Sequence, residues 1–368
     1  MGALAVCKRR GNERHVSAGD RHVQLVVVFV LARMRVYRLR KLRHLRVGVL
    51  TGKQEKGGVP AFLSATAPAG LWHRRGRHCA NMAVSERVCT FAGWQVRLDL
   101  AAHVYTATRG GQRAPGPVVS VTTFGGALFP AFDAASAVAR MHGPRRAAKY
   151  GAMTDTQIVR YWDANRDHAA DLGTRMHSVM EAWLGAIMAD PAAAAATIPA
   201  VPAPRPPIYE DCVPRALVDD GVVVKAAHLR AFADYMRETD IVPVAAEKCV
   251  FAADLQMAGT VDAIFRRRAT GELLLYDWKR RPEYTTENPW QCGLPGTPVA
   301  AMPDCHHAHA TVQLNLYREL LRRGEGLQIG EMHIISLHPA LADVLDSIVP
   351  IDLRLTAALL ATRRAQLP

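Results

Sequence analysis

The residues best suited to chemistry lie in two short stretches, Gly259-Thr-Val-Asp262 and Asp277-Trp-Lys279. Both aspartates fall within apolar runs, where a desolvated carboxylate is costly unless it is paired or binds a metal ion. Lys279 shares a strand face with Asp277, because side chains alternate along a strand with a period of two. Two carboxylates and one ammonium at a sheet edge predict a site for a divalent cation and an activated water. Such a site suits phosphodiester hydrolysis.

Two helical pairs add further candidates. His177 and Glu181 are four residues apart and therefore share one helix face. The imidazole could ligate a divalent ion, and Glu181 could hold a second metal ion or orient a water. Gln313 and Tyr317 have the same spacing. Gln313 could hydrogen-bond a water or a phosphate, and Tyr317 could stack on a base or donate to the backbone.

Several of these residues also have purely structural interpretations. Asp277 and Lys279 could form an ordinary ion pair on a solvated hairpin, although the apolar run 273–276 before them favours burial. A single helical histidine is more often a core or surface residue than a ligand. Glu247 could be an additional acid of the site or a structural partner of a nearby cation. The candidate cations are Arg266, Arg267 and Lys279.

Hydrophobic periodicity predicts the elements that would position these residues. The pattern predicts helices over 129–141, 155–162, 165–188, 226–237, 309–323 and 353–364. Strands are predicted over 118–123, 244–252, 257–267, 272–278 and 331–337, with Thr270-Gly271 as a tight turn. Around the candidate residues, the order is helix, three strands, helix, strand.

The charge distribution separates the first hundred residues from the rest. Residues 1–100 carry 19 Lys and Arg against 5 Asp and Glu, in a chain whose total net charge is +13. We expect them to be a disordered basic extension, or to lie upstream of the true start at Met34 or Met82. A basic amphipathic helix, a nucleic-acid arm and an organelle presequence are alternatives for residues 34–49. The packed domain is expected over 101–368, with a Pro/Ala-rich surface insertion at about 189–207.

The cysteine pattern and the hydropathy of the chain predict the cellular compartment in which the protein works. The seven cysteines show no Cys-x-x-Cys pair, which predicts reduced thiols in an intracellular protein of the cytoplasm or nucleus. Cys292 with Cys305-His306-His307 could form a metal cluster, but a polar loop is the preferred interpretation. The apolar run 23–32 is too short to cross a bilayer, and no cleavage pattern follows it closely. We therefore expect neither a secretory signal nor a membrane partner.

The ordered motifs resemble those of the PD-(D/E)XK nuclease superfamily, in its RecB-like exonuclease branch. The resemblance covers about residues 101–345 and consists of Gly173-Thr-x-x-His177-x-x-x-Glu181, Gly259-Thr-Val-Asp262, Asp277-Trp-Lys279 and Gln313-x-x-x-Tyr317. Upstream, Ser120-Val-Thr122, Phe129-Pro-Ala-Phe-Asp133, Lys149-Tyr150 and Met153-Thr154 look like the N-terminal part of nucleases of large DNA viruses. Mitochondrial genome-maintenance exonucleases are more distant relatives by the same motifs.

The resemblance implies a fold, a reaction and roles for the residues. The fold would be α/β, a restriction-endonuclease-like αβββαβ core whose central mixed sheet is flanked by helices. The chain would be a Mg²⁺- or Mn²⁺-dependent deoxyribonuclease acting on single-stranded DNA or duplex ends in replication, repair or recombination. The implied metal ligands are His177, Asp262 and Asp277. The implied catalytic residues are Lys279, Asp277, Asp262, Glu181 and Gln313. The implied substrate contacts are Tyr317, Gln313, Ser120, Thr122 and Arg280.

The sequence departs from some relatives. The four-cysteine iron–sulfur pattern has no counterpart, so we predict no cluster. Helicase motifs are absent from the sequence, so a helicase or other replication or recombination partner would be a separate protein. Two alternatives remain open at this point. One is a nucleic-acid-binding module of the same fold without catalysis, and the other is a zinc-dependent hydrolase that uses His177 and Glu181.

Overall fold

The computed structural model describes residues 86–100, 102–190 and 221–367. The basic extension before residue 86 and nearly all of the Pro/Ala-rich insertion lie outside the described residues. Within these ranges, no helix combines the length and the apolar character that a membrane crossing requires.

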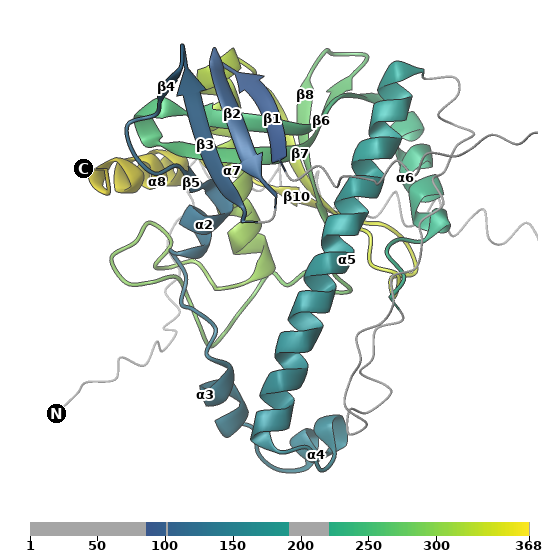
Figure 1. The fold of residues 1–368 in the computed structure, drawn as a ribbon. Coiled ribbons are helices and arrows are strands. Elements are labelled where there is room, and N and C mark those ends of the chain that lie inside the picture. Colours follow the sequence, from purple (N-terminus) through teal and green to yellow (C-terminus); the bar gives the residue numbers. More distant parts are fainter. Residues whose placement is uncertain (1–85, 101, 191–220, 368) are drawn as a thin grey trace, which may run out of the picture. The chain divides into compact units, whose positions relative to one another are not determined.

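A six-stranded mixed sheet forms the centre of the fold (Figure 1). Its strands are β5 (Val119–Ser120), β6 (Ile241–Ala252), β7 (Met257–Arg267), β8 (Leu273–Lys279), β9 (Ile329–Ser336) and β10 (Leu345–Val349). The order is β10-β9-β8-β7-β5, and β6 also pairs with β7. β6, β7 and β8 are antiparallel neighbours, whereas β9 runs parallel to β8 after a helical crossover. The expected central mixed sheet is confirmed.

One edge of β7 is left open in its middle. β8 pairs with β7 through 263–266, and β5 pairs with it through Met257 and Ala258. Among the described residues, 259–262 therefore have no strand partner on that edge. Past Tyr276, β8 no longer pairs with the backbone of β7. The backbone N–H of Trp278 instead donates to the side-chain carboxylate of Asp262 at 2.8 Å. The divergence of β7 and β8 creates the space in which the candidate residues meet.

Helices cover both faces of the sheet, as expected (Figure 1). The long helices are α5 (Asp155–Ala189), α6 (Ala226–Glu238), α7 (His306–Glu325) and α8 (Leu353–Ala365). α5 and α6 pack on one face, where the Phe232 ring lies 5.2 Å from Trp278 and 6.0 Å from Phe265. α7 and α8 pack in a second apolar cluster with Ile264, Leu275 and other sheet residues. The position of each functional helix is thus fixed by burial of its apolar stripe.

The described part of the chain begins with a second, smaller sheet that the sequence did not predict. It is an antiparallel meander of β1 (Glu86–Phe91), β2 (Trp94–Asp99), β3 (Val104–Arg109) and β4 (Gln112–Arg113). The packed domain therefore begins by residue 86, not near residue 101. The alternation in these strands is short, at most six residues long, and was not recognised within the basic first hundred residues. Their inner side chains, including Phe91 and Val96, join the cluster around α7.

Cys89 and Cys249 form a disulfide between β1 and β6. This corrects the expectation of reduced thiols for these two residues, which are 160 positions apart and become neighbours only through the fold. Cys292 and Cys305 are free. Cys305 is the N-cap of α7, so Cys305-His306-His307 begins a helix and is not a loop.

Other elements differ from the predictions in extent. The expected strand over 118–123 is reduced to β5 at Val119–Ser120, and helix α2 (Val121–Gly126) begins directly after it, because the Ser120 hydroxyl accepts from the Thr123 N–H and caps the helix. The two helices expected between 155 and 188 are one helix, α5, which begins with a capping box at Thr154. The expected helix over 129–141 is reduced to α3 (Ala134–Ala139). Helix α4 (Pro144–Tyr150) and strand β10 were not predicted.

A buried histidine of strand β9, His333, should make stability depend on pH. His333 Nδ1 lies 2.9 Å from Asp346 Oδ1, and His333 Nε2 lies 3.4 Å from Glu331 Oε2. The imidazole ring stacks on the ring of Tyr276. Burial lowers the pKa of His333, but the two carboxylates outweigh burial and raise it to about 9. Because the folded pKa exceeds the ordinary value, the extra stability is full below about pH 6.5 and is lost as the pH rises through about 9.

We expect His333→Gln to remove this dependence. The free energy of unfolding of the unmodified protein should fall relative to that of the variant by on the order of 3 kcal/mol between pH 6 and pH 9.5. Urea unfolding of both proteins at pH 6, 7.5 and 9.5 measures the difference. Identical pH profiles for the two proteins would contradict the prediction.

Candidate active site

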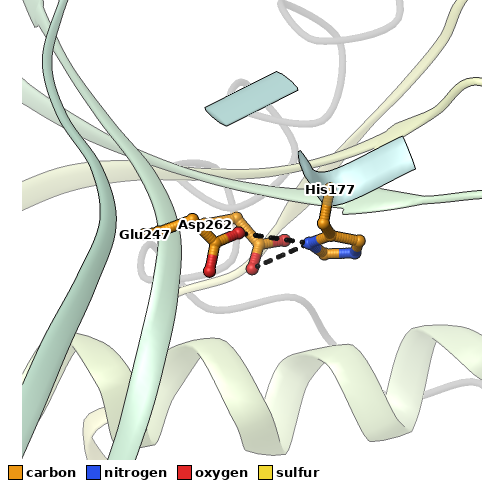
Figure 2. A group of neighbouring side chains, drawn as sticks. All are labelled: His177, Glu247 and Asp262. Carbon is orange, nitrogen blue, oxygen red and sulfur yellow. Dashed lines mark ion pairs between the residues drawn. The ribbon is translucent and has the colours of Figure 1, made fainter. Parts of the chain in front are cut away.

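Three side chains from three elements converge at the divergence of β7 and β8. Figure 2 shows His177 of α5 pointing toward Glu247 of β6 and Asp262 of β7. His177 Nδ1 lies 3.5 Å from Glu247 Oε1 and 3.5 Å from Asp262 Oδ1. One ligand atom from each residue lies within 4.8 Å of the other two. One imidazole nitrogen and two carboxylate oxygens form a donor set that fits Mn²⁺ or Mg²⁺.

An unusual backbone conformation places Glu247 in this cluster. Its φ is +46°, in the left-handed region that a non-glycine residue rarely adopts inside a strand. The neighbouring pairs Ala246–Ala263 and Lys248–Val261 keep the β6–β7 register, so Glu247 lies opposite Asp262. Local strain of this kind clusters at functional sites. Of the roles left open for Glu247, the structure places it among the acids of the cluster, and its cationic partner is Arg87.

Asp277 lies beside the cluster, on β8, and is almost fully buried. Its Oδ2 is 2.6 Å from Lys279 Nζ, and its Oδ1 accepts from Gln313 Nε2 of α7 at 2.8 Å. The strand alternation that predicted a shared face for Asp277 and Lys279 is confirmed. The structure does not place Asp277 within the three-residue group of close ligand atoms.

The charges of these groups depend on one another. Burial lowers the pKa of His177, but Asp262 and Glu247 outweigh it and raise that pKa to about 10. Burial raises the pKa of Asp277 to about 6, with Lys279 opposing the rise. For Asp262, the cations His177 and Lys279 overcome burial and hold its pKa below the usual value. The cluster thus carries a proton on His177 that an entering metal ion must displace.

Arg87 is a site residue that the sequence analysis missed. Its Nη2 donates to Glu181 Oε2 at 2.8 Å, and its Nη1 donates to Glu247 Oε2 at 3.1 Å. Arg87 lies on β1, in the region expected to be a disordered extension. Only the alternation of exposed and partly buried side chains along residues 86–91 could have indicated that Arg87 belongs to a strand of a folded sheet.

Tyr317 does not lie at the surface. Its ring is buried against Gly259, where an added Cβ would lie 2.5 Å from Tyr317 Cε1. Burial raises the pKa of Tyr317 well above its usual value, and the hydroxyl hydrogen-bonds Gln313. The predicted stacking of Tyr317 on a base does not fit this position. Its ring instead supports the helix turn that carries Gln313.

A pocket of about 290 Å³ adjoins Lys279 and Gln313. Its lining includes Thr122 of α2 and the side chain of Arg281. Arg280, the predicted substrate contact, is directed elsewhere and donates to the Val222 carbonyl at 2.6 Å. β8 ends at Lys279, so both arginines follow the strand, and only Arg281 is among the residues that line the pocket.

The other predicted substrate contact of this region, Ser120, has a structural role. Its hydroxyl caps α2 and lies 3.0 Å from the Thr122 hydroxyl, which faces the pocket. Ser120 therefore positions the turn that presents Thr122.

Comparison with known proteins places this geometry in a family. No curated protein matches the chain. A family model described as the PD-(D/E)XK nuclease superfamily matches residues 148–348. The match includes His177, Glu247, Asp262 and the Asp277–Lys279 pair, but it begins beyond Arg87 and the small N-terminal sheet. With more than half of its length matched and the expected core around the site, the chain belongs to the PD-(D/E)XK nuclease superfamily.

Proposed function

We propose that this nuclease is a Mg²⁺- or Mn²⁺-dependent deoxyribonuclease that degrades DNA from its ends in replication, repair or recombination. The observation that carries the proposal is the convergence of the His177, Glu247 and Asp262 ligand atoms beside Asp277 and Lys279. The order of the motifs, which resembles the RecB-like branch, supports action at DNA ends. Partner proteins such as a helicase would be separate chains.

The metal would be held by His177, Asp262 and Glu247, with Asp277 as a further candidate. When bound, a divalent ion supplies Lewis-acid chemistry, which lowers the pKa of water and offsets negative charge on a phosphate. Water would attack phosphorus in line as the bond to the 3′ oxygen breaks, with the proton of the water passing to solvent and the leaving 3′ oxygen taking one up. The Lys279 ammonium, fixed by Asp277, would orient the attacking water and stabilise the charge that develops on the phosphate.

The pocket beside Lys279 would receive the DNA backbone. Thr122 offers a hydroxyl and Arg281 a guanidinium, groups that commonly bind phosphate oxygens. Gln313 would remain on Asp277 and hold that carboxylate in the orientation that Lys279 requires. Substrate contacts are therefore assigned to Thr122 and Arg281, in place of Ser120 and Arg280.

Circular and end-labelled linear DNA, single- and double-stranded, test this function. With Mg²⁺, the unmodified protein should degrade linear DNA and spare circles, and EDTA should stop the reaction. Asp277→Ala should yield no product, whereas Asp171→Ala, which removes a surface pair with Arg175 on α5, should cleave normally.

Other results would contradict the proposal or favour one of the alternatives. Cleavage of circles would overturn the requirement for ends, and full activity of Asp277→Ala would overturn the assignment of the site. Metal-dependent DNA binding without product after long incubation would favour an inactive binding module. Bound zinc, with activity that tolerates Lys279→Ala, would favour the zinc hydrolase.

A further inference from the structure

Arg87 joins two carboxylates that come from different elements. Its guanidinium contacts Glu181 of α5 at 2.8 Å and Glu247 of β6 at 3.1 Å. Nη1 also lies 3.4 Å from the backbone oxygen of Glu247, the residue with the left-handed backbone. A guanidinium is planar and permanently charged, and it binds carboxylates through several fixed donors. Arg87 is therefore a fixed cation at the rim of the site.

The two oxygens of Glu247 face different cations. Oε1 faces His177 in the group of close ligand atoms, and Oε2 accepts from Arg87. Glu181, which the sequence suggested for a second metal ion, is outside that group and also binds Arg87. A second divalent ion bridging Glu181 and Glu247 would compete with Arg87 for Glu181 Oε2 and Glu247 Oε2. At such short range, it would also be repelled by the guanidinium.

The strand that carries Arg87 is held rigidly against the site. β1 pairs with β2 along its whole length. The disulfide joins Cys89 to Cys249, and each cysteine lies two residues beyond Arg87 or Glu247. Arg87 is 26% exposed, and the Glu247 side chain is 13% exposed, so the contact is shielded from bulk water. Shielding strengthens a charge-assisted pair, and a rigid strand lowers the entropic cost of holding the arginine in place.

We propose that Arg87 is a built-in cation that takes the place of a second metal ion, so that this nuclease binds one divalent ion per chain. The inference rests on the proposed metal site at His177, Glu247 and Asp262. Arg87 is a positioning residue, which neutralises Glu181 and holds Glu247 with its Oε1 directed toward the proposed metal site. It lies outside the part of the chain that matches the family.

Mn²⁺ binding to the full chain, measured by isothermal titration calorimetry and by electron paramagnetic resonance, tests the proposal. The unmodified protein should bind one Mn²⁺ per chain, and Arg87→Ala should bind two. The double variant Arg87→Ala/Glu181→Gln should return to one, because the second ion would lose a ligand. Arg87→Lys, which keeps the charge, should remain at one. As a matched control, Arg97→Ala removes an arginine of the same sheet that pairs with Glu86, and should also bind one.

The outcomes separate this inference from the proposed function. Two Mn²⁺ ions on the unmodified protein, or one on a folded Arg87→Ala, would overturn the role of Arg87 and leave the metal site intact. Absence of Mn²⁺ from the unmodified protein would overturn the metal site itself. If Arg87→Ala does not fold, as judged by circular dichroism, Arg87→Met keeps the aliphatic stem without the charge. Two Mn²⁺ ions on Arg87→Met would then support the proposal, and one would overturn it.

Discussion

Lys279→Met should lower kcat for DNA cleavage by on the order of 10³-fold, because it removes a preorganised charge from the reacting phosphate. The Lys279 ammonium lies 2.6 Å from Asp277 Oδ2, and its strand is held by β9 through a pair between Lys279 and Ser336. Methionine preserves the aliphatic stem but removes the ammonium. Loss of the ammonium also leaves Asp277 buried without its cation, which favours the protonated carboxyl.

Single-turnover cleavage of end-labelled DNA at saturating Mg²⁺ measures this effect on the chemical step. Lys248→Met is a matched control, since Lys248 is exposed to a similar extent, 26% against 27%, and pairs with Glu325. The control should retain activity within a few-fold. Thermal unfolding of both variants would show whether the fold is intact. A folded Lys279→Met protein with a rate within tenfold of the original would contradict the role assigned to Lys279.

Gly259→Ala should damage both stability and activity. The new Cβ would lie 2.5 Å from Tyr317 Cε1, well inside contact distance, and 3.2 Å from the hydroxyl. The ring is buried, so it cannot withdraw without moving α7. Overpacking of this kind costs about 1–3 kcal/mol. Displacement of Tyr317 would also move Gln313, one turn earlier, away from Asp277.

Urea unfolding and cleavage assays on the same preparations test both effects of Gly259→Ala. Gly173→Ala on α5 is the control, because nothing lies within 4 Å of its added Cβ. Helix propensity predicts that this control gains roughly 0.5–1 kcal/mol. Equal stability of the two variants would show that the Tyr317 ring is not the constraint proposed for residue 259.

The sequence predicted the parts of the site that follow from local periodicity. The shared face of Asp277 and Lys279 follows from the period of a strand, whereas the proximity of His177 to Asp262 was expected only from the resemblance of the motifs to a known family. The contact of Gln313 with Asp277 was not predicted, because the sequence suggested a water or a phosphate as the partner of that amide.

The remaining parts depend on contacts that local patterns cannot encode. Arg87 meets Glu247 across 160 positions, through a small sheet whose strands are only six residues long. No residue type or spacing in the sequence around Glu247 predicts its left-handed backbone conformation. Tyr317 shows the limit of helix-face arguments, since a shared face with Gln313 does not reveal whether it points to solvent or to Gly259. Arg280 and Arg281 follow the end of β8, so strand periodicity could not tell which of them would line the pocket.

The parallel pairing of β8 with β9 has a consequence for how the protein is made. Asp277 and Lys279 pair with Ile334 and Ser336, so their strand lacks one neighbour until the chain has been synthesised past residue 336. Asn315, on the helix that carries Gln313, donates to the Pro350 carbonyl and accepts from the Asp352 N–H. These long-range contacts form late in folding. A nascent chain on the ribosome would therefore carry the acids of the site without the framework that assembles them, and we expect no hydrolysis until the chain has been synthesised past residue 352.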